Sequence, residues 1–293
     1  MSSTRWSIRG CGREARRVDN RLLPFGGLEY AALTVLLLFL LIGFLAPWIM
    51  PYAPDQINMG EVLKAPGAAY LLGTDPLGRD ILSRLLMGTR ISIGFAVVTT
   101  FCTMGVGLVV GILSGWCGGK VDAAVQTVVN IFQGVPSFSL MIALAGILEP
   151  GFVSMLIAIV ATSWTGFSRV VRGEVLRLKN SPFVEGLRAL GAEPSFIIRY
   201  YVLRSLAPVI SVLFTIRVGS VLLSAAGLSY IGIGLQPPLA DWGLMVNEGQ
   251  TYCRTYPLLL YAPGACIFFL CLSVNLLGES LKRRFMKPDW LGK

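Results

Sequence analysis

The sequence predicts an all-α membrane protein with six transmembrane helices. Of its 293 residues, 54% are hydrophobic and 14% are charged, and the mean hydropathy is +0.69. A soluble globular domain carries about 25% charged residues, so this composition excludes one. Apolar runs of about 20 residues, the length that spans the hydrocarbon core as a helix, alternate with polar segments along the chain.

The N-terminal segment, residues 1–29, is polar and carries six arginines. The first apolar run follows at residues 30–50. This run is longer than the apolar region of a signal peptide, and no small-residue cleavage site follows it. We therefore predict an uncleaved first transmembrane helix, preceded by a basic segment in the cytoplasm.

The largest polar loop, residues 51–90, is predicted to lie outside the cytoplasm. Asp75-Pro76 and Gly78 supply turn chemistry, and Asp80 can cap a following helix. The apolar residues after Asp80 recur at helical spacing, which predicts a short amphipathic helix within this loop. An irregular surface loop or a helix lying on the membrane would show the same pattern.

Five further apolar segments complete the predicted core, which extends over residues 91–280. In the second span, Gly107, Gly111 and Gly115 recur every fourth residue, which predicts close helix packing. Pro136 lies inside the third span and predicts a kink. The five segments cover approximately residues 91–116, 121–148, 152–171, 206–231 and 258–277.

The distribution of the 25 Lys and Arg residues predicts the orientation. Most of them lie in segments that share one side of the membrane when the N-terminus is inside, as the positive-inside rule requires. This places both termini, the loop at residues 173–205 and the tail at 281–293 in the cytoplasm. The basic residues flank apolar runs instead of covering one face, so the net charge of +9 reflects topology and not nucleic-acid binding.

A polar stretch at residues 181–208 interrupts the apolar runs. Ser181 or Asn180 can cap a first helix, Gly191 is predicted to end it in a left-handed conformation, and Pro194 begins a second helix. The first helix carries an apolar stripe that needs a partner, which is either another protein or the lipid surface. The stripe consists of Phe183, Leu187 and Leu190.

Several kinds of chemistry are excluded by the residues present. The chain has no histidine, and its six cysteines form no CxxC pair, which argues against a zinc site or a disulfide framework. The residues around Gly119-Lys120 do not match the phosphate-binding loop motif, because Ser114 stands where the motif has its first glycine and Val121 where it has Ser or Thr. Any ATP chemistry must therefore reside on another chain, and we predict no enzyme, no metal and no cofactor here.

The polar stretch resembles the EAA loop of bacterial ABC-importer permeases, with Glu185 at the acidic position and Gly191 six residues on. Gly186 and Leu187 stand where two alanines are usual in that family. The resemblance implies a coupling helix that enters a cleft on an ATPase subunit. The residues it assigns to this contact are Phe183, Val184, Glu185, Gly186, Leu187, Arg188, Leu190, Gly191 and Ala192.

Two further strings, GTDPLGRD at 73–80 and GLSYIGIGLQPP at 227–238, resemble the C-type permeases of dipeptide, oligopeptide and nickel importers. This resemblance, over about residues 30–290, implies the type I ABC-importer permease fold in a bacterial cytoplasmic membrane. It also implies a second homologous permease subunit, two ATPase subunits that hold ATP and Mg²⁺, and an extracytoplasmic substrate-binding protein. The residues of the outer-loop signature are Gly73, Thr74, Asp75, Gly78, Arg79 and Asp80.

The segment 226–249 is predicted to be irregular and turn-rich, with Asp241, Trp242 and Gly243 at the membrane interface, where Trp is favoured. Arg217 lies about 16 Å along the fifth span, near the bilayer middle, where an arginine costs on the order of 3 kcal/mol and needs a partner. The candidates are backbone carbonyls, a neighbouring permease subunit, or the three glutamates near span ends. Those glutamates are Glu149, Glu248 and Glu279.

Arg217 also carries a functional hypothesis, because it could line the translocation path and attract a substrate carboxylate. The function predicted from the sequence is a permease subunit that forms half of a path for peptides. A path for nickel or a metal chelate is the first alternative. A secondary transporter is the alternative of another class, and the lack of Asp and Glu inside the spans disfavours it.

Overall fold

The structure is a computed structural model that describes residues 26–285. Most of the predicted segments 1–29 and 281–293 therefore lies outside the described residues. Within 26–285 the chain is helical and forms no strand. The helices are α1 (Gly27–Ile49), η2 (Met59–Glu61), α2 (Ile81–Cys117), α3 (Gly119–Gly134), α4 (Ser137–Ile147), α5 (Phe152–Lys179), α6 (Pro182–Ala189), α7 (Pro194–Ile197), a π-helical turn (Ile198–Val202), α8 (Leu203–Tyr230), α9 (Trp242–Gln250) and α10 (Leu258–Phe285).

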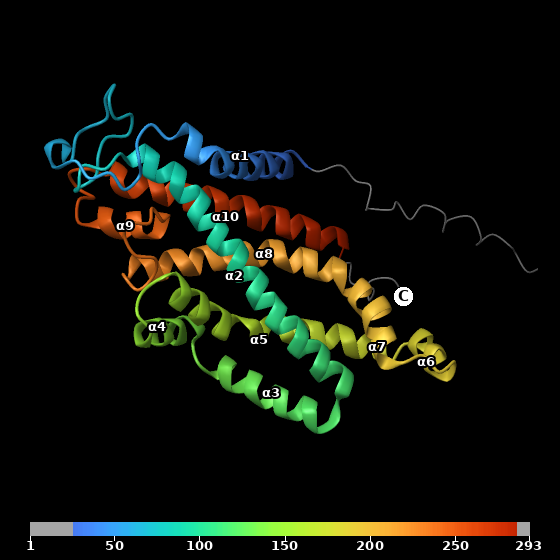
Figure 1. Cartoon of the computed structure of the whole chain (residues 1–293). Helices are drawn as coiled ribbons and strands as arrows, with labels where there is room; N and C mark the ends of the chain where they lie inside the picture. The colour runs from blue at the N-terminus through green and yellow to red at the C-terminus, as the bar shows by residue number, and fades with distance from the viewer. Residues whose placement is uncertain (1–25, 286–293) are drawn as a thin grey trace, which may run out of the picture.

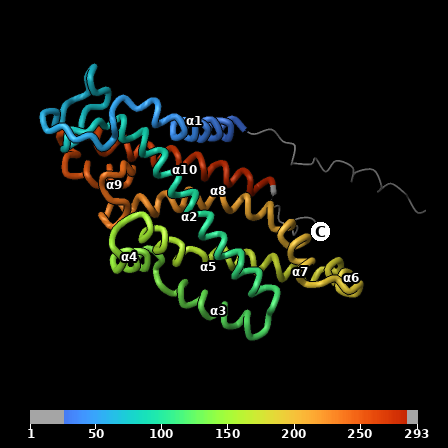
Figure 2. Tube along the Cα trace, in the orientation of Figure 1, coloured from blue at the N-terminus to red at the C-terminus, as the bar shows by residue number. Residues whose placement is uncertain are grey.

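Five of these units are long and apolar enough to cross a membrane: α1, α2, α5, the unit formed by α7 and α8, and α10. The α3–α4 pair makes a sixth when it is counted as one broken span. Six predicted spans are thus consistent with the described residues. The kink predicted at Pro136 is confirmed, and α3 and α4 meet there at 90° (Figure 2).

The prediction of a separate amphipathic helix inside residues 51–90 was wrong. Asp80 does cap a helix, since its carboxylate accepts the Ser83 amide at 2.8 Å, but that helix is α2 and continues for 37 residues to Cys117. No proline interrupts this stretch, so the amphipathic turns continue directly into the apolar span. Helices α5, α8 and α10 also extend past their predicted spans, because hydropathy marks the part in lipid and not the helix end.

The predicted glycine packing on α2 is confirmed. A Cβ on Gly111 would lie 2.7 Å from the carbonyl oxygen of Ser168 in α5, and Gly107 and Gly115 approach the same helix as closely. Because a side chain at these positions would meet backbone atoms, glycine lets α2 and α5 lie in direct contact. Figure 1 shows α2 crossing α5.

The helices place two groups of connections at opposite ends of the molecule (Figure 1). The loop between α1 and α2, together with α9, lies at one end, and the hairpin formed by α6 and α7 lies at the other. Helix α1 packs against α2 and α10, and α8 packs against α10. The first group contains the outer-loop signature, and the second contains the predicted coupling residues.

Trp242, predicted at the membrane interface, has its side chain in the protein interior, and the segment 226–249 is not wholly irregular. Trp242 begins α9 and is fully buried, with its indole N–H donating to the Leu85 carbonyl at 3.2 Å. Gly88 on α2 leaves the space that its ring fills. Asp241 caps α9 and accepts from the Ser92 hydroxyl at 2.7 Å, while burial raises the pKa of its carboxyl.

Candidate functional site

The α6–α7 hairpin, residues 181–197, has the predicted caps. The Ser181 hydroxyl oxygen accepts the Val184 amide at 3.4 Å at the start of α6. At its end Gly191 has a φ of +81°, its amide donates to the Arg188 carbonyl at 2.9 Å, and the next amide donates to the Leu187 carbonyl at 3.0 Å. These paired bonds form a Schellman motif, which requires a left-handed residue after the helix.

The hairpin is anchored by two buried side chains and presents apolar ones to the outside. Val184 on α6 and Ile197 on α7 are 2% and 0% exposed. Phe183 is exposed and Leu190 is 86% exposed, whereas Leu187 between them is half-buried. The predicted stripe therefore does leave apolar surface uncovered, while Val184, which lies beside the stripe, is buried.

A contact that the sequence did not reveal joins the hairpin to the end of α2. The Arg188 guanidinium lies 5.1 Å above the centre of the Trp116 ring, and the Lys179 ammonium donates to the Trp116 carbonyl at 2.6 Å. Trp116 occupies the last turn of α2. A cation–π contact therefore joins α6 to the end of α2, in addition to the backbone connection.

An ion pair near this end joins α3 to α5. The Arg172 guanidinium donates twice to the Asp122 carboxylate, with both nitrogen–oxygen distances at 2.6 Å. The Ser114 hydroxyl of α2 also donates to Asp122, so three helices meet at one carboxylate. Such a bidentate pair has a fixed geometry, and it holds α3 in place although α3 contacts the rest of the chain sparsely.

Arg217 lies near the middle of α8 and bonds to α5, where its Nη2 donates to the Ser163 carbonyl at 2.5 Å. Of the predicted partners, a backbone carbonyl is the one found. Glu248 and Glu279 instead pair with other arginines, and no carboxylate among residues 26–285 forms an ion pair with Arg217. The guanidinium borders a cavity of about 200 Å³ that is lined by Met104, Gly166, Val170, Leu213, Ile216 and Ser220.

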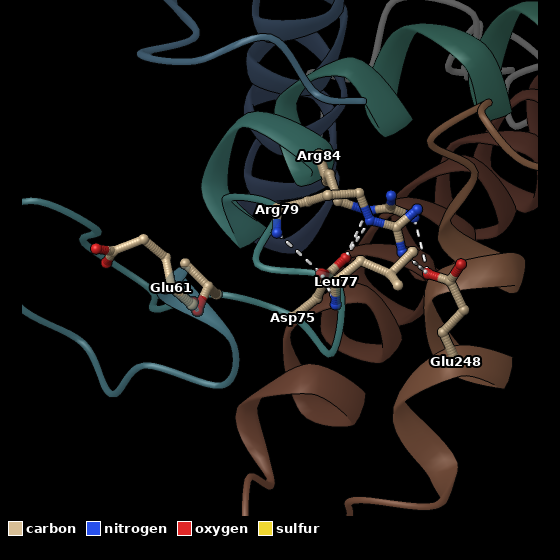
Figure 3. A network of polar contacts seen from close by, with 7 residues as sticks. Glu61, Asp75, Leu77, Arg79, Arg84 and Glu248 are labelled. Atoms are coloured by element: carbon tan, nitrogen blue, oxygen red, sulfur yellow. Dashed lines mark hydrogen bonds and ion pairs between the residues drawn. The ribbon is translucent and has the colours of Figure 1, made fainter. Parts of the chain in front are cut away.

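The outer-loop signature forms a buried charge network with α9, shown in Figure 3. Asp75 accepts the Leu77 and Arg79 amides at 2.8 and 3.0 Å and the Arg79 Nε at 2.5 Å. Arg79 and Arg84 then donate to the same Glu248 oxygen on α9, at 2.9 and 2.8 Å. This network connects the α1–α2 loop and the start of α2 to α9.

The other signature residues shape the same loop. Gly73 and Gly78 have φ values of +81° and +71°, and a Cβ on Gly78 would overlap the Asn58 carbonyl. The Thr74 hydroxyl accepts the Lys64 amide at 2.8 Å and donates to the Glu61 carbonyl. The six signature residues thus come together, and their contacts within the loop and with α9 are those of a folded brace.

Glu248 and Arg84 were missed as members of this brace because nothing in the local sequence pairs residues from α2 and α9. Asp122 and Arg172 were missed for the same reason. Their only sequence signal is a charge close to a span end, which ordinarily faces water or headgroups. No group of three or more His, Cys, Asp or Glu within the described part of the chain is arranged to hold a metal.

The sequence matches two described families. Residues 107–287 match the family described as "Binding-protein-dependent transport system inner membrane component". Residues 29–66 match "N-terminal TM domain of oligopeptide transport permease C".

Curated relatives cover nearly the whole chain. The nickel transport system permease protein NikC of Escherichia coli K12 is 35% identical over 86% of this chain and 91% of its own length. The glutathione transport system permease protein GsiD of Pectobacterium atrosepticum is 35% identical over 86% of this chain and 84% of its own. The oligopeptide transport system permease protein OppC of Bacillus subtilis is 32% identical over 87% of this chain and 84% of its own length.

Among solved structures, a chain of the inward-facing MetNI methionine ABC transporter superposes with a TM-score of 0.57. The superposition covers 71% of this chain and 98% of that one, at 19% identity. The likeness therefore concerns the arrangement of helices.

Proposed function

Because this chain belongs to the binding-protein-dependent transport system inner membrane components, the permease family of ABC importers, we propose that it forms half of a path for peptides and couples ATP hydrolysis on partner subunits to uptake. The predicted type I importer permease fold and inner-membrane location are confirmed. Family membership also excludes the alternative function of a secondary transporter. The members of the family are membrane components of importers that work with ATPase and substrate-binding subunits, and they are not catalytic enzymes.

The observation that carries the coupling role is the capped α6 helix, on which Phe183 and Leu190 are exposed and Val184 is buried. An exposed apolar helix on a preformed hairpin suits the groove of a protein partner better than water. In our proposal this partner is one of two ATPase subunits, which hold ATP and Mg²⁺. The hairpin and both termini then face the cytoplasm.

The proposed mechanism uses the rigid pair of α2 and α5. Closure of the ATPases on ATP displaces α6, and the Arg188–Trp116 contact transmits the displacement to the end of α2. Because glycine-mediated contact joins α2 to α5, and Asp122 joins α3 to α5, these helices move together. Alternation between two arrangements opens the path on one side at a time. A second, homologous permease subunit supplies the other half, and a substrate-binding protein delivers solute from outside.

Peptides are our first proposal for the solute, supported by a cationic guanidinium beside a mid-span cavity. Nickel, free or chelated, is the second candidate, and the 35% identity to a nickel permease favours it. Accumulation of radiolabelled tripeptide or ⁶³Ni²⁺ in proteoliposomes, with and without ATP, decides between them. The solute retained by the accompanying binding protein on purification gives an independent answer.

Cross-linking tests the coupling role directly. In a cysteine-free background, a cysteine at Leu190 is expected to cross-link to the ATPase subunit, whereas a cysteine at buried Val184 is not. Uptake measured in the same vesicles shows that the complex is active. ATP-driven uptake with no cross-link from Leu190 would refute the proposed coupling helix.

A further inference from the structure

One face of the α5–α8 pair carries two arginines in a strip that is otherwise small or apolar. On α8, Arg217, Ser220 and Ser224 fall at i, i+3 and i+7, so they share a side of the helix. On α5, Gly166 and Arg169 are both exposed. Gly166, Arg217 and Ser220 of this strip line the cavity of about 200 Å³ described above.

The Arg217 guanidinium keeps most of its hydrogen-bonding capacity for something outside the described residues. A guanidinium has five N–H donors, and residues 26–285 accept one hydrogen bond from it, at Ser163. A Cβ on Gly166 would lie 3.8 Å from its Nη2 and meet nothing closer. The glycine therefore leaves open space directly in front of the charge.

Arg169 repeats this arrangement closer to the α6–α7 hairpin. It follows Ser163 by six residues on α5, which is about 9 Å along the helix axis. Its Nη2 donates to the Asn130 side-chain oxygen of α3 at 2.5 Å, which orients the guanidinium. Within residues 26–285, neither Arg169 nor Arg217 forms an ion pair with a carboxylate, in contrast to Arg79 of the outer-loop signature and to Arg172.

We propose that Arg217 and Arg169 are two successive binding stations for a carboxylate on the transported solute. A guanidinium binds a carboxylate through two parallel hydrogen bonds, so each station selects an anionic planar group. A free divalent cation meets two like charges on the same strip and is disfavoured. The substrate class is then a solute with a free carboxylate, either a peptide with an unblocked C-terminus or a metal held in an anionic chelate. This inference rests on the proposed permease function.

The test compares trialanine with its C-terminal amide in ATP-driven uptake by the complete complex in proteoliposomes. For the wild-type complex we expect preference for the free acid. Arg217→Gln is expected to lower kcat/KM for the free acid by roughly tenfold, because one charge-assisted contact is lost. The value of kcat/KM for the amide should stay unchanged. Arg169→Gln and Gly166→Val, which fills the space before the guanidinium, are expected to act in the same direction.

The matched control is Arg90→Gln, which removes an exposed arginine of α2 whose backbone lies beside Gly43 of α1. Its acid-to-amide ratio should equal the wild-type value. Affinities of the binding protein for both peptides, measured separately, remove its own selectivity from the comparison. An acid-to-amide ratio that stays constant in Arg217→Gln overturns the stations, because a merely structural arginine would reduce both solutes equally.

Failure of the proposed peptide function is distinguishable from failure of the stations. If neither peptide accumulates with ATP, the peptide assignment fails, and the same variants are measured with ⁶³Ni²⁺ as the free ion and as its citrate chelate. Preference for the chelate that is lost in Arg217→Gln supports the carboxylate stations. Uptake of the free ion at equal or higher rate overturns them.

Discussion

The brace between the α1–α2 loop and α9 predicts a large effect from one substitution, Glu248→Ala. Arg79 and Arg84 have side chains that are 4% and 1% exposed, and both donate to the same Glu248 oxygen. Removing one partner of a buried ion pair costs about 3–5 kcal/mol, because it leaves uncompensated buried charge. Asp75 stays in place at 2.5 Å from Arg79, so we expect the lower end of that range, about 3 kcal/mol.

The assay is thermal unfolding of the purified complex in detergent. At about 2–4 °C per kcal/mol for a chain of this size, the midpoint should fall by roughly 6–12 °C. Limited proteolysis should reveal faster cleavage in the α1–α2 loop. The double variant Glu248→Ala/Arg84→Met removes one of the two buried charges as well, so it should recover part of the loss.

The control is Glu279→Ala, which removes another glutamate paired with arginine. Its side chain is 50% exposed and that of its partner Arg283 is 76% exposed, so the pair is screened by solvent. We expect a change below about 1 kcal/mol. Equal midpoints for Glu248→Ala and Glu279→Ala, with an unchanged rate of loop cleavage, would refute the brace.

Three further predictions concern the transmission of motion. Gly111→Leu places a side chain against the α5 backbone, where even a Cβ would lie 2.7 Å from an oxygen, and should severely lower assembly and uptake, whereas Gly105→Leu on the open side of α2 should be tolerated. Equal expression and uptake of the two variants would disprove the contact. In Gly191→Pro the proline cannot adopt a φ of +81°, so the protein should stay in the membrane with ATP hydrolysis uncoupled from uptake, while Gly191→Asn should keep the coupling. Normal solute-stimulated transport by the Pro variant would count against this prediction. Trp116→Ala removes a cation–π contact of about 0.5–1 kcal/mol and should raise the ATP consumed per solute, unlike exposed Trp48→Ala on α1.

Local signals in the sequence were sufficient to predict the α6–α7 hairpin. Ser181 and Gly191 act through hydrogen bonds to residues three positions away, and Pro182 acts through its fixed φ in the first turn, so their effect does not depend on the rest of the fold. Hydropathy located the spans for a similar reason, since lipid contact is a property of each segment alone. The glycines on α2 also predicted packing correctly, although they did not identify α5 as the partner.

The contacts that failed to emerge from the sequence are those between distant segments. Trp242 was placed at the interface from the average behaviour of Trp, but Gly88 provides a site that buries it. Glu248 was considered as a partner for Arg217 and pairs instead with Arg79 and Arg84. Such pairings depend on how helices dock, and a single sequence carries no record of that.

The continuity of α2 changes how the two ends of the molecule relate. The sequence suggested a loop helix followed by a separate span, whereas the structure has one helix of 37 residues, about 55 Å long. Arg84 in its first turns joins the brace with α9, and Trp116 in its last turn contacts the α6–α7 hairpin. A helix without a break transmits axial displacement with little loss, because each turn is hydrogen-bonded to the next. The outer-loop signature and the predicted coupling residues, which are 100 or more positions apart in the chain, therefore contact the two ends of one continuous helix.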